Sequence, residues 1–114
     1  MKTDLSYLKN MSGGAYEVMK EMIDLFIEQV AEISDEMHAA YDKKDWIFLG
    51  KLAHKAKSSV SIMGMNDLSV LLKNLELNAA EGKNIESYKP TIDLFDSDCG
   101  QALIELTTYL EEAK

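Results

Sequence analysis

Apolar residues recur at intervals of three and four along most of the 114-residue chain, a spacing typical of amphipathic α-helices. The clearest stripe runs from Ala15 to Ile33, with acidic side chains on the other faces. It continues through Met37 and Tyr41 after a bend expected near Ser34, where the serine could cap a new turn. The spacing therefore predicts a long, bent helix with one buried face.

A second stripe begins at Trp46, and Asp45 is expected to cap its helix. This helix should run to about Met63 and end at Gly64 in the left-handed conformation. Its expected core face consists of Trp46, Leu49, Ala53, Ala56, Val60 and Met63.

The next helix is expected to be capped by Asn66 or Asp67 and to end near Gly82. Its expected apolar seam consists of Leu68, Leu71, Leu72, Leu75 and Ala79. The last helix should begin at Ser87 or Lys89 and tolerate Pro90 in its first turn. Its expected buried stripe consists of Ile92, Phe95, Cys99, Leu103, Leu106 and Leu110.

The chain contains one proline and six glycines, and no segment shows the alternation expected of a strand. We therefore predict an all-α fold, an antiparallel four-helix bundle with a short N-terminal helix. The expected organisation is a single domain over residues 1–114, with 1–12 as a cover segment and 13–114 as the bundle. The apolar residues of the cover segment could pack on the bundle end or join a docking surface, and packing is favoured; they are Leu5, Tyr7, Leu8 and Met11.

Composition excludes several functional classes. Twenty acidic residues against twelve basic ones, all lysine, give a net charge of −8, which argues against binding nucleic acid. No apolar run has the length of a membrane span and none resembles a signal peptide, so we expect a cytoplasmic protein that does not bind membranes. No glycine-rich loop for phosphates is present, which argues against an ATP-using enzyme.

One helix, 46–63, carries a second and unusual stripe, formed by Gly50, His54, Lys57, Ser58 and Ser61. Small residues on an outward face leave the imidazole of His54 accessible to another protein. An isolated surface histidine often has no function, so the stripe alone leaves both interpretations open. His38 is expected to be an ordinary surface side chain. Because the two histidines lie on different helices, no metal site is expected.

Leu49 to Leu68 read LGKLAHKAKSSVSIMGMNDL, and this segment resembles the histidine phosphotransfer (HPt) domain family. The shared pattern is an alanine–histidine pair, a lysine three residues later, small residues around them, and then a glycine and a leucine. Here these positions are Ala53-His54, Lys57, Gly64 and Leu68. The helix order and lengths extend the likeness over nearly the whole chain.

The chain departs from the family pattern at a few positions. Ser58 and Ser61 stand where relatives often have glycine, and both are still small. Ala56 stands where a larger apolar residue is common. Some relatives place a glutamine near the histidine, whereas this chain has Glu76 on the next helix. Its carboxylate would repel a phosphoryl group if it pointed there, so Glu76 is assigned no role.

The resemblance implies a phosphocarrier rather than an enzyme. His54 would accept a phosphoryl group and pass it between receiver-domain aspartates, with Lys57 offsetting its charge. The implied partners are response-regulator receiver domains, which supply the Mg²⁺, and a hybrid sensor histidine kinase. The chain itself would need no cofactor or metal and would be a monomer. The expected docking residues are Gly50, Lys51, Lys55, Ser58 and Ser61.

Two alternatives remain open. The chain could be the phosphoacceptor domain of a larger chemotaxis-type or hybrid histidine kinase, or a helical adaptor that binds receiver domains without being phosphorylated. A ferritin-like metal enzyme is set aside, because neither histidine is preceded by glutamate at the required three-residue spacing.

The net charge conceals an uneven distribution. Five of the twelve lysines lie between Lys43 and Lys57, with Asp45 as the one acidic residue among them. The helix that carries His54 is therefore locally basic within an acidic protein. We expect this basic surface to steer the acidic phosphorylation pocket of a receiver domain toward the histidine.

Overall fold

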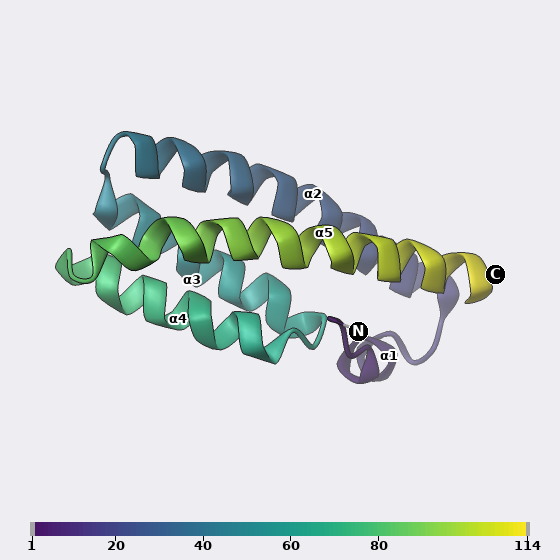
Figure 1. The fold of residues 1–114 in the computed structure, drawn as a ribbon. Coiled ribbons are helices and arrows are strands. Elements are labelled where there is room, and N and C mark those ends of the chain that lie inside the picture. The colour runs from purple at the N-terminus through teal and green to yellow at the C-terminus, as the bar shows by residue number, and fades with distance from the viewer. Residues whose placement is uncertain (1, 114) are drawn as a thin grey trace.

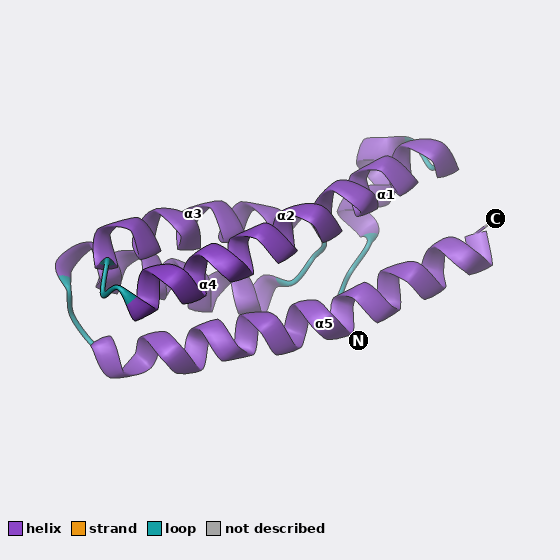
Figure 2. Ribbon diagram, turned by 90° about the horizontal axis from the view of Figure 1, so that it is seen from above, coloured by secondary structure: helices purple, strands orange, loops and turns teal. Residues whose placement is uncertain are grey.

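The structure is a computed structural model that describes residues 2–113, and the regular structure of these residues is entirely helical (Figures 1 and 2). Met1 and Lys114, the ends of the expected single domain, lie outside the described residues. The elements are α1 (Ser6–Ser12), α2 (Tyr16–Asp42), α3 (Trp46–Ile62), α4 (Asn66–Glu81), the short 3₁₀ helix η1 (Ile85–Ser87) and α5 (Tyr88–Ala113).

The four longer helices make a closed ring of contacts. Helix α2 packs against α3 and α5, and α4 packs against the same two helices. The 27-residue α2 and the 26-residue α5 extend past the shorter α3 and α4 at one end, where α1 lies (Figure 1). The molecule is accordingly elongated, with extents of 45 × 20 × 20 Å. No helix among residues 2–113 is long and apolar enough to cross a membrane.

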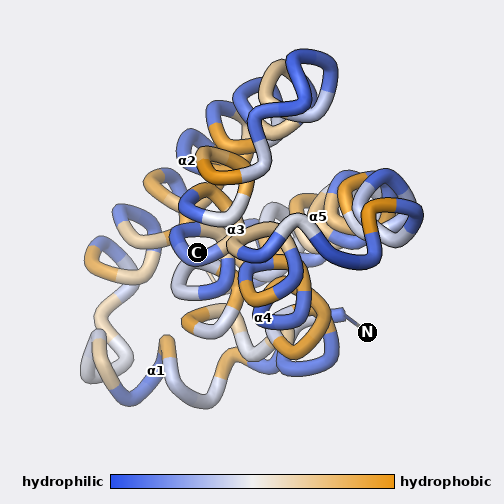
Figure 3. The backbone as a smooth tube through the Cα atoms, turned by 90° about the vertical axis from the view of Figure 1, so that its left-hand side faces the viewer, coloured by the Kyte–Doolittle hydropathy of each residue, from blue (hydrophilic) through white to orange (hydrophobic). Residues whose placement is uncertain are grey.

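The predicted apolar stripes form one continuous core. Hydrophobic and polar positions alternate along the helices (Figure 3), and the buried hydrophobic residues of the long helices belong to one cluster. Ile23, Leu49, Leu72 and Phe95, one from each long helix, are fully buried. Cys99 lies in the same core as predicted, and burial, with the nearby Asp98 and Asp96, raises the pKa of its thiol to about 12.

Three predicted local signals are confirmed. The Asp45 carboxylate accepts a hydrogen bond from the Phe48 backbone N–H at 3.2 Å, so it caps α3. Gly64 and Gly82 follow α3 and α4 with φ values of 71° and 66°. Both positions are in the left-handed region, where glycine is favoured over residues with a side chain.

Three other local predictions are wrong. Helix α2 continues through Ser34, whose hydroxyl donates to Asp96 instead of capping a new turn. Helix α4 begins at Asn66, with Met65 at the cap position and no side-chain cap, so neither Asn66 nor Asp67 plays that role. Leu71, expected in the buried seam, is partly exposed.

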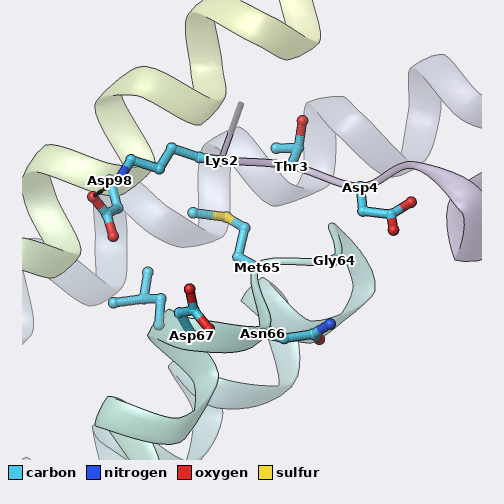
Figure 4. A pocket seen from close by; sticks show the side chains of 9 residues that line it. Lys2, Thr3, Asp4, Gly64, Met65, Asn66, Asp67 and Asp98 are labelled. Carbon is cyan, nitrogen blue, oxygen red and sulfur yellow. Dashed lines mark ion pairs between the residues drawn. The ribbon is translucent and has the colours of Figure 1, made fainter.

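The N-terminal segment crosses from α5 to the turn between α3 and α4 (Figure 4). The Glu105 carboxylate of α5 accepts hydrogen bonds from the backbone N–H groups of Lys2 and Thr3 and from the Thr3 hydroxyl, at 2.8–3.1 Å. Partial burial raises the pKa of Glu105, but these hydrogen bonds and one from Gln101 lower it by more, so that the resulting pKa is about 2. The segment is thus attached to α5 because several of its hydrogen-bond donors bond to one carboxylate of that helix.

The other end of the segment is attached to the α3–α4 turn. The Asp4 N–H donates to the carbonyl oxygen of Met63 at 3.0 Å. A Cβ atom at Gly64 would lie 2.2 Å from the Asp4 carbonyl oxygen, so this glycine is required by close approach as well as by its φ. In α1, Leu8 is fully buried while Tyr7 and Met11 are exposed, so only part of the expected cover is realised.

Candidate functional site

Helix α3 presents His54 to solvent at its centre. Most of the expected core face is confirmed: Leu49, Ala53, Ala56 and Val60 are completely buried, and they fix the rotation of the helix. Trp46, also expected on this face, is only partly buried. His54 lies on the side of α3 that faces α4, and 62% of its side chain is exposed. An imidazole held in this way is within reach of another protein.

Glu76 of α4 contacts the imidazole directly. Its Oε2 atom lies 3.0 Å from Nδ1 of His54, and its Oε1 atom lies 3.2 Å from Nζ of Lys57. One carboxylate therefore joins the two residues that the sequence analysis selected on α3. From the sequence alone Glu76 is assigned no role, because its carboxylate would repel a phosphoryl group if it pointed toward the histidine.

The contact with Glu76 determines which nitrogen is available for chemistry. A carboxylate only accepts hydrogen bonds, so the bond at 3.0 Å requires the proton of neutral His54 to be on Nδ1. The lone pair is then on Nε2, which makes no hydrogen bond to any residue in the described part of the chain. The Glu76 carboxylate lies at Nδ1, so it would not directly face a phosphoryl group bound to Nε2, and the repulsion expected from the sequence does not apply directly.

Lys57 lies one turn beyond His54 on the same helix. Its side chain is only 26% exposed, and its ammonium is held by Glu76 rather than extended into solvent. A lysine restrained in this way keeps a positive charge next to the imidazole. Glu76 is similarly covered, at 28% exposure.

The predicted docking residues separate into two groups. Lys51, Lys55, Ser58 and Ser61 are exposed on α3, as expected. Gly50 is buried, which corrects its placement on the outward face. A Cβ atom at this position would lie 3.4 Å from the Glu76 carbonyl oxygen and 3.5 Å from the Ala79 Cβ. Both distances are ordinary van der Waals contacts, so Gly50 lies at the packed boundary between α3 and α4 beside the histidine.

A groove of about 400 Å³ lies next to His54 between the two helices. Its walls are mostly apolar, and it is lined by Ile47, Gly50, Lys51, His54, Glu76 and Ala80. A second cavity lies at the N-terminal segment and is lined by Lys2 and Asp98, among others. The wall of the groove beside His54 is more apolar than the wall of that cavity.

The second histidine is not the ordinary surface side chain that we expected. Nε2 of His38 lies 2.6 Å from one oxygen of Asp96, and the Ser34 hydroxyl donates to the other oxygen at 2.5 Å. The signal in the sequence is weak: a serine and a histidine one turn apart on α2, and an acid on a distant helix. Within residues 2–113, no three His, Cys, Asp or Glu side chains converge to form a metal site.

Fold and site together define an all-helical protein that presents one exposed histidine, with a lysine three residues later, on the surface of a helix. The family model of the Hpt domain matches residues 21–114, so the chain belongs to the Hpt domain family. The resemblance seen in the sequence is thereby confirmed. Membership implies phosphotransfer in two-component phosphorelays, with receiver domains and histidine kinases as partners. Comparisons with curated proteins and with solved structures gave no match.

Proposed function

We propose that this protein is a phosphocarrier whose phosphoacceptor is Nε2 of His54. One observation carries the proposal: His54 is largely exposed while its Nδ1 is bonded to Glu76, which leaves Nε2 directed away from the carboxylate. The expected antiparallel four-helix bundle is the scaffold, and the ring of contacts among α2, α3, α4 and α5 supports it.

The transfer step follows from this geometry. The Nε2 lone pair attacks the phosphorus of an aspartyl phosphate on a receiver domain, an N–P bond forms, and the bond between phosphorus and the aspartate oxygen breaks. The aspartate leaves as a carboxylate. The proton on Nδ1 stays where it is and balances part of the charge, and the hydrogen bond to Glu76 stabilises the resulting cationic ring. The reverse reaction passes the phosphoryl group to the next receiver.

Lys57 supplies positive charge near the transferring phosphoryl group. Its ammonium is already located beside the imidazole by Glu76, so little conformational freedom has to be lost at the moment of transfer. Serine hydroxyls on the same face are small enough to let the receiver approach closely. Ser61 is bonded to the Lys57 carbonyl oxygen at 2.8 Å and to the Ser69 hydroxyl at 2.9 Å, which keeps it close to the helix surface.

The partners proposed are receiver domains of response regulators and of a hybrid sensor histidine kinase. The exposed Lys51 and Lys55 would attract the acidic pocket of a receiver. The receiver would supply the Mg²⁺, so the protein would need no cofactor of its own and would act as a transfer intermediate rather than as an enzyme. We further propose that it is a cytoplasmic monomer.

The direct test is to incubate the protein with phosphorylated receiver domains and to search for acid-labile, alkali-stable phosphate. Label at His54 that is absent from His54→Gln, with the helical content unchanged, is the expected result. A His54→Gln variant that still receives phosphate would contradict the assignment. Absence of label with every receiver, together with stable complexes, would favour the adaptor function instead.

A further inference from the structure

Most of the groove between α3 and α4 takes no part in the chemistry of phosphotransfer. His54 and Glu76 line one part of it, and from the imidazole it extends along α3 toward the N-terminal end of that helix, past Lys51 and Ile47. Ile47 forms its outer rim and is 60% exposed, one turn before Lys51 on the same helix. An exposed isoleucine beside a reactive side chain is a candidate contact for a partner protein.

Two small residues line the groove. Gly50 has no side chain to enter it on the α3 side, and Ala80 leaves space on the α4 side, where a longer side chain would fill the gap. The groove is thus an apolar depression with a charged rim, since Lys51 lies at its edge.

On the side of His54 opposite the groove, the surface is polar rather than apolar. Toward the C-terminal end of α3 it presents the hydroxyl groups of Ser58 and Ser61, and Ser69 of α4 bonds to Ser61 across the helices. Apolar surface therefore flanks the histidine on one side and hydroxyl groups flank it on the other. A partner protein that covers His54 and carries an apolar residue beside its own reactive group can place that residue in the groove in one orientation only.

We propose that the groove receives one aliphatic side chain of the receiver domain that exchanges phosphate with His54, and that Ile47 and Ala80 thereby select the receiver. This inference rests on the proposed function. The occupant is a receiver because the groove is continuous with the imidazole and is lined by Lys51, one of the two lysines that would attract an acidic phosphorylation pocket.

A second apolar depression on the molecule is a weaker candidate. It lies between α2 and α3, has a volume of only about 80 Å³, and does not include His54. Leu25 forms part of its lining and is 54% exposed, which provides a comparison for the test. Ile104 of α5, 62% exposed and outside both depressions, provides a matched control.

The experiment uses two variants of the groove, Ile47→Ser and Ala80→Leu, and the control variants Leu25→Ser and Ile104→Ser. First, each protein is treated with phosphoramidate, which transfers its phosphoryl group to imidazole with loss of ammonia and does not need a receiver. Both groove variants should be labelled at His54 like the wild type. Absence of this label in the wild type, and of any transfer from receivers, would instead reject the proposed function.

Second, transfer is measured with the phosphorylated receiver domain that labels the wild-type protein. Both groove variants should lose about tenfold in kcat/KM, mainly through a higher KM, with kcat nearly unchanged. The two control variants should retain the wild-type value. Groove variants that transfer like the wild type would overturn the proposal, and so would a larger loss in Leu25→Ser.

Sedimentation separates a further possibility. If the wild type forms a dimer that Ile47→Ser dissociates, the groove is occupied by a second copy of this chain and the receiver proposal is overturned. A monomer for both proteins, at the concentrations of the transfer assay, supports it.

Discussion

The molecule holds two histidine–carboxylate pairs, and they differ in nearly every respect that matters for chemistry. His54 and Glu76 join α3 to α4, with 62% of the imidazole exposed and Lys57 on the same carboxylate. His38 and Asp96 join α2 to α5, with the imidazole 36% exposed and a serine on the second carboxylate oxygen. A carboxylate beside a histidine is therefore not enough to distinguish the candidate site.

The difference lies in which nitrogen each carboxylate contacts and in what surrounds it. Glu76 contacts Nδ1 of His54 and leaves Nε2 free of this carboxylate, whereas Asp96 contacts Nε2 of His38. Among residues 2–113, the first pair alone has a lysine bonded to its carboxylate and an apolar groove beside it. The second pair joins residues 58 positions apart in sequence and so links α2 to α5.

The largest expected effect separates the two histidines completely. A protein with only His54, made by His38→Gln, should form phosphohistidine like the wild type, because the Nε2 of His54 is unchanged. A protein with only His38, made by His54→Gln, should form none. Phosphorus NMR after treatment with phosphoramidate measures both. Equal signals from the two variants would show that the environments do not discriminate between the imidazoles.

Lysine replacement should have the next largest effect. Lys57→Ala removes the positive charge beside His54 and should slow transfer from a phosphorylated receiver by about tenfold or more, as expected for a charge-assisted contact. The control is Lys89→Ala, because Lys89 pairs with Asp93 and interacts electrostatically with Asp96, the partner of the other histidine. Single-turnover transfer rates should fall for Lys57→Ala alone, and a similar fall in both variants would indicate a general charge effect.

For the stability of the fold, unlike for phosphotransfer, the carboxylate beside His38 should matter more than the carboxylate beside His54. Asp96→Ala breaks two short hydrogen bonds between α2 and α5 and should lower the free energy of unfolding by about 1–2 kcal/mol. Glu76→Ala should lower it by less than about 1 kcal/mol, because its contacts are longer and the largely exposed His54 can bond to water instead. Urea denaturation measures both, and a greater loss for Glu76→Ala would contradict the structural interpretation of Asp96.

The smallest expected effect concerns the ring proton of His54. Glu76→Gln keeps an oxygen that can accept from Nδ1 but loses the ion pair with Lys57, so transfer should slow by only about two- to fivefold. Nitrogen-15 NMR of the imidazole should still show the proton on Nδ1 in this variant and a mixture of tautomers in Glu76→Ala. Asp96→Asn should leave the His54 signals unchanged. Mixed tautomers in the wild type would show that Glu76 does not fix the proton.

Much of the fold could be predicted because each helix carries its own periodic apolar stripe. The cap at Asp45 and the helix end at Gly64 were also predicted, since both depend on residues adjacent in sequence. The expected bend at Ser34 was wrong because its hydroxyl finds Asp96, which is 62 residues away. Local signals cannot reveal a partner that only tertiary packing brings into place.

The same limit applies at the site. The spacing of His54 and Lys57 selected both residues, because one helical turn puts them on the same face. The roles of Gly50 and Glu76 depend on how closely α4 approaches α3, which no pattern within either helix specifies. Gly50 was accordingly placed on the outward face, although it is buried between the helices.

The N-terminal segment has a consequence for where the folding unit ends. The family match begins at residue 21, yet Lys2 to Asp4 are bonded to both α5 and the turn that follows the histidine-bearing helix. The pKa of Glu105, about 2, lies below its ordinary value of 4.5, so these bonds stabilise the fold above about pH 4.5 and are lost as the pH falls toward 2. A protein trimmed to residues 21–114 would keep all residues that the family model matches. It would lose the hydrogen bonds to Glu105, which persist until the pH approaches 2, and the burial that Leu8 provides.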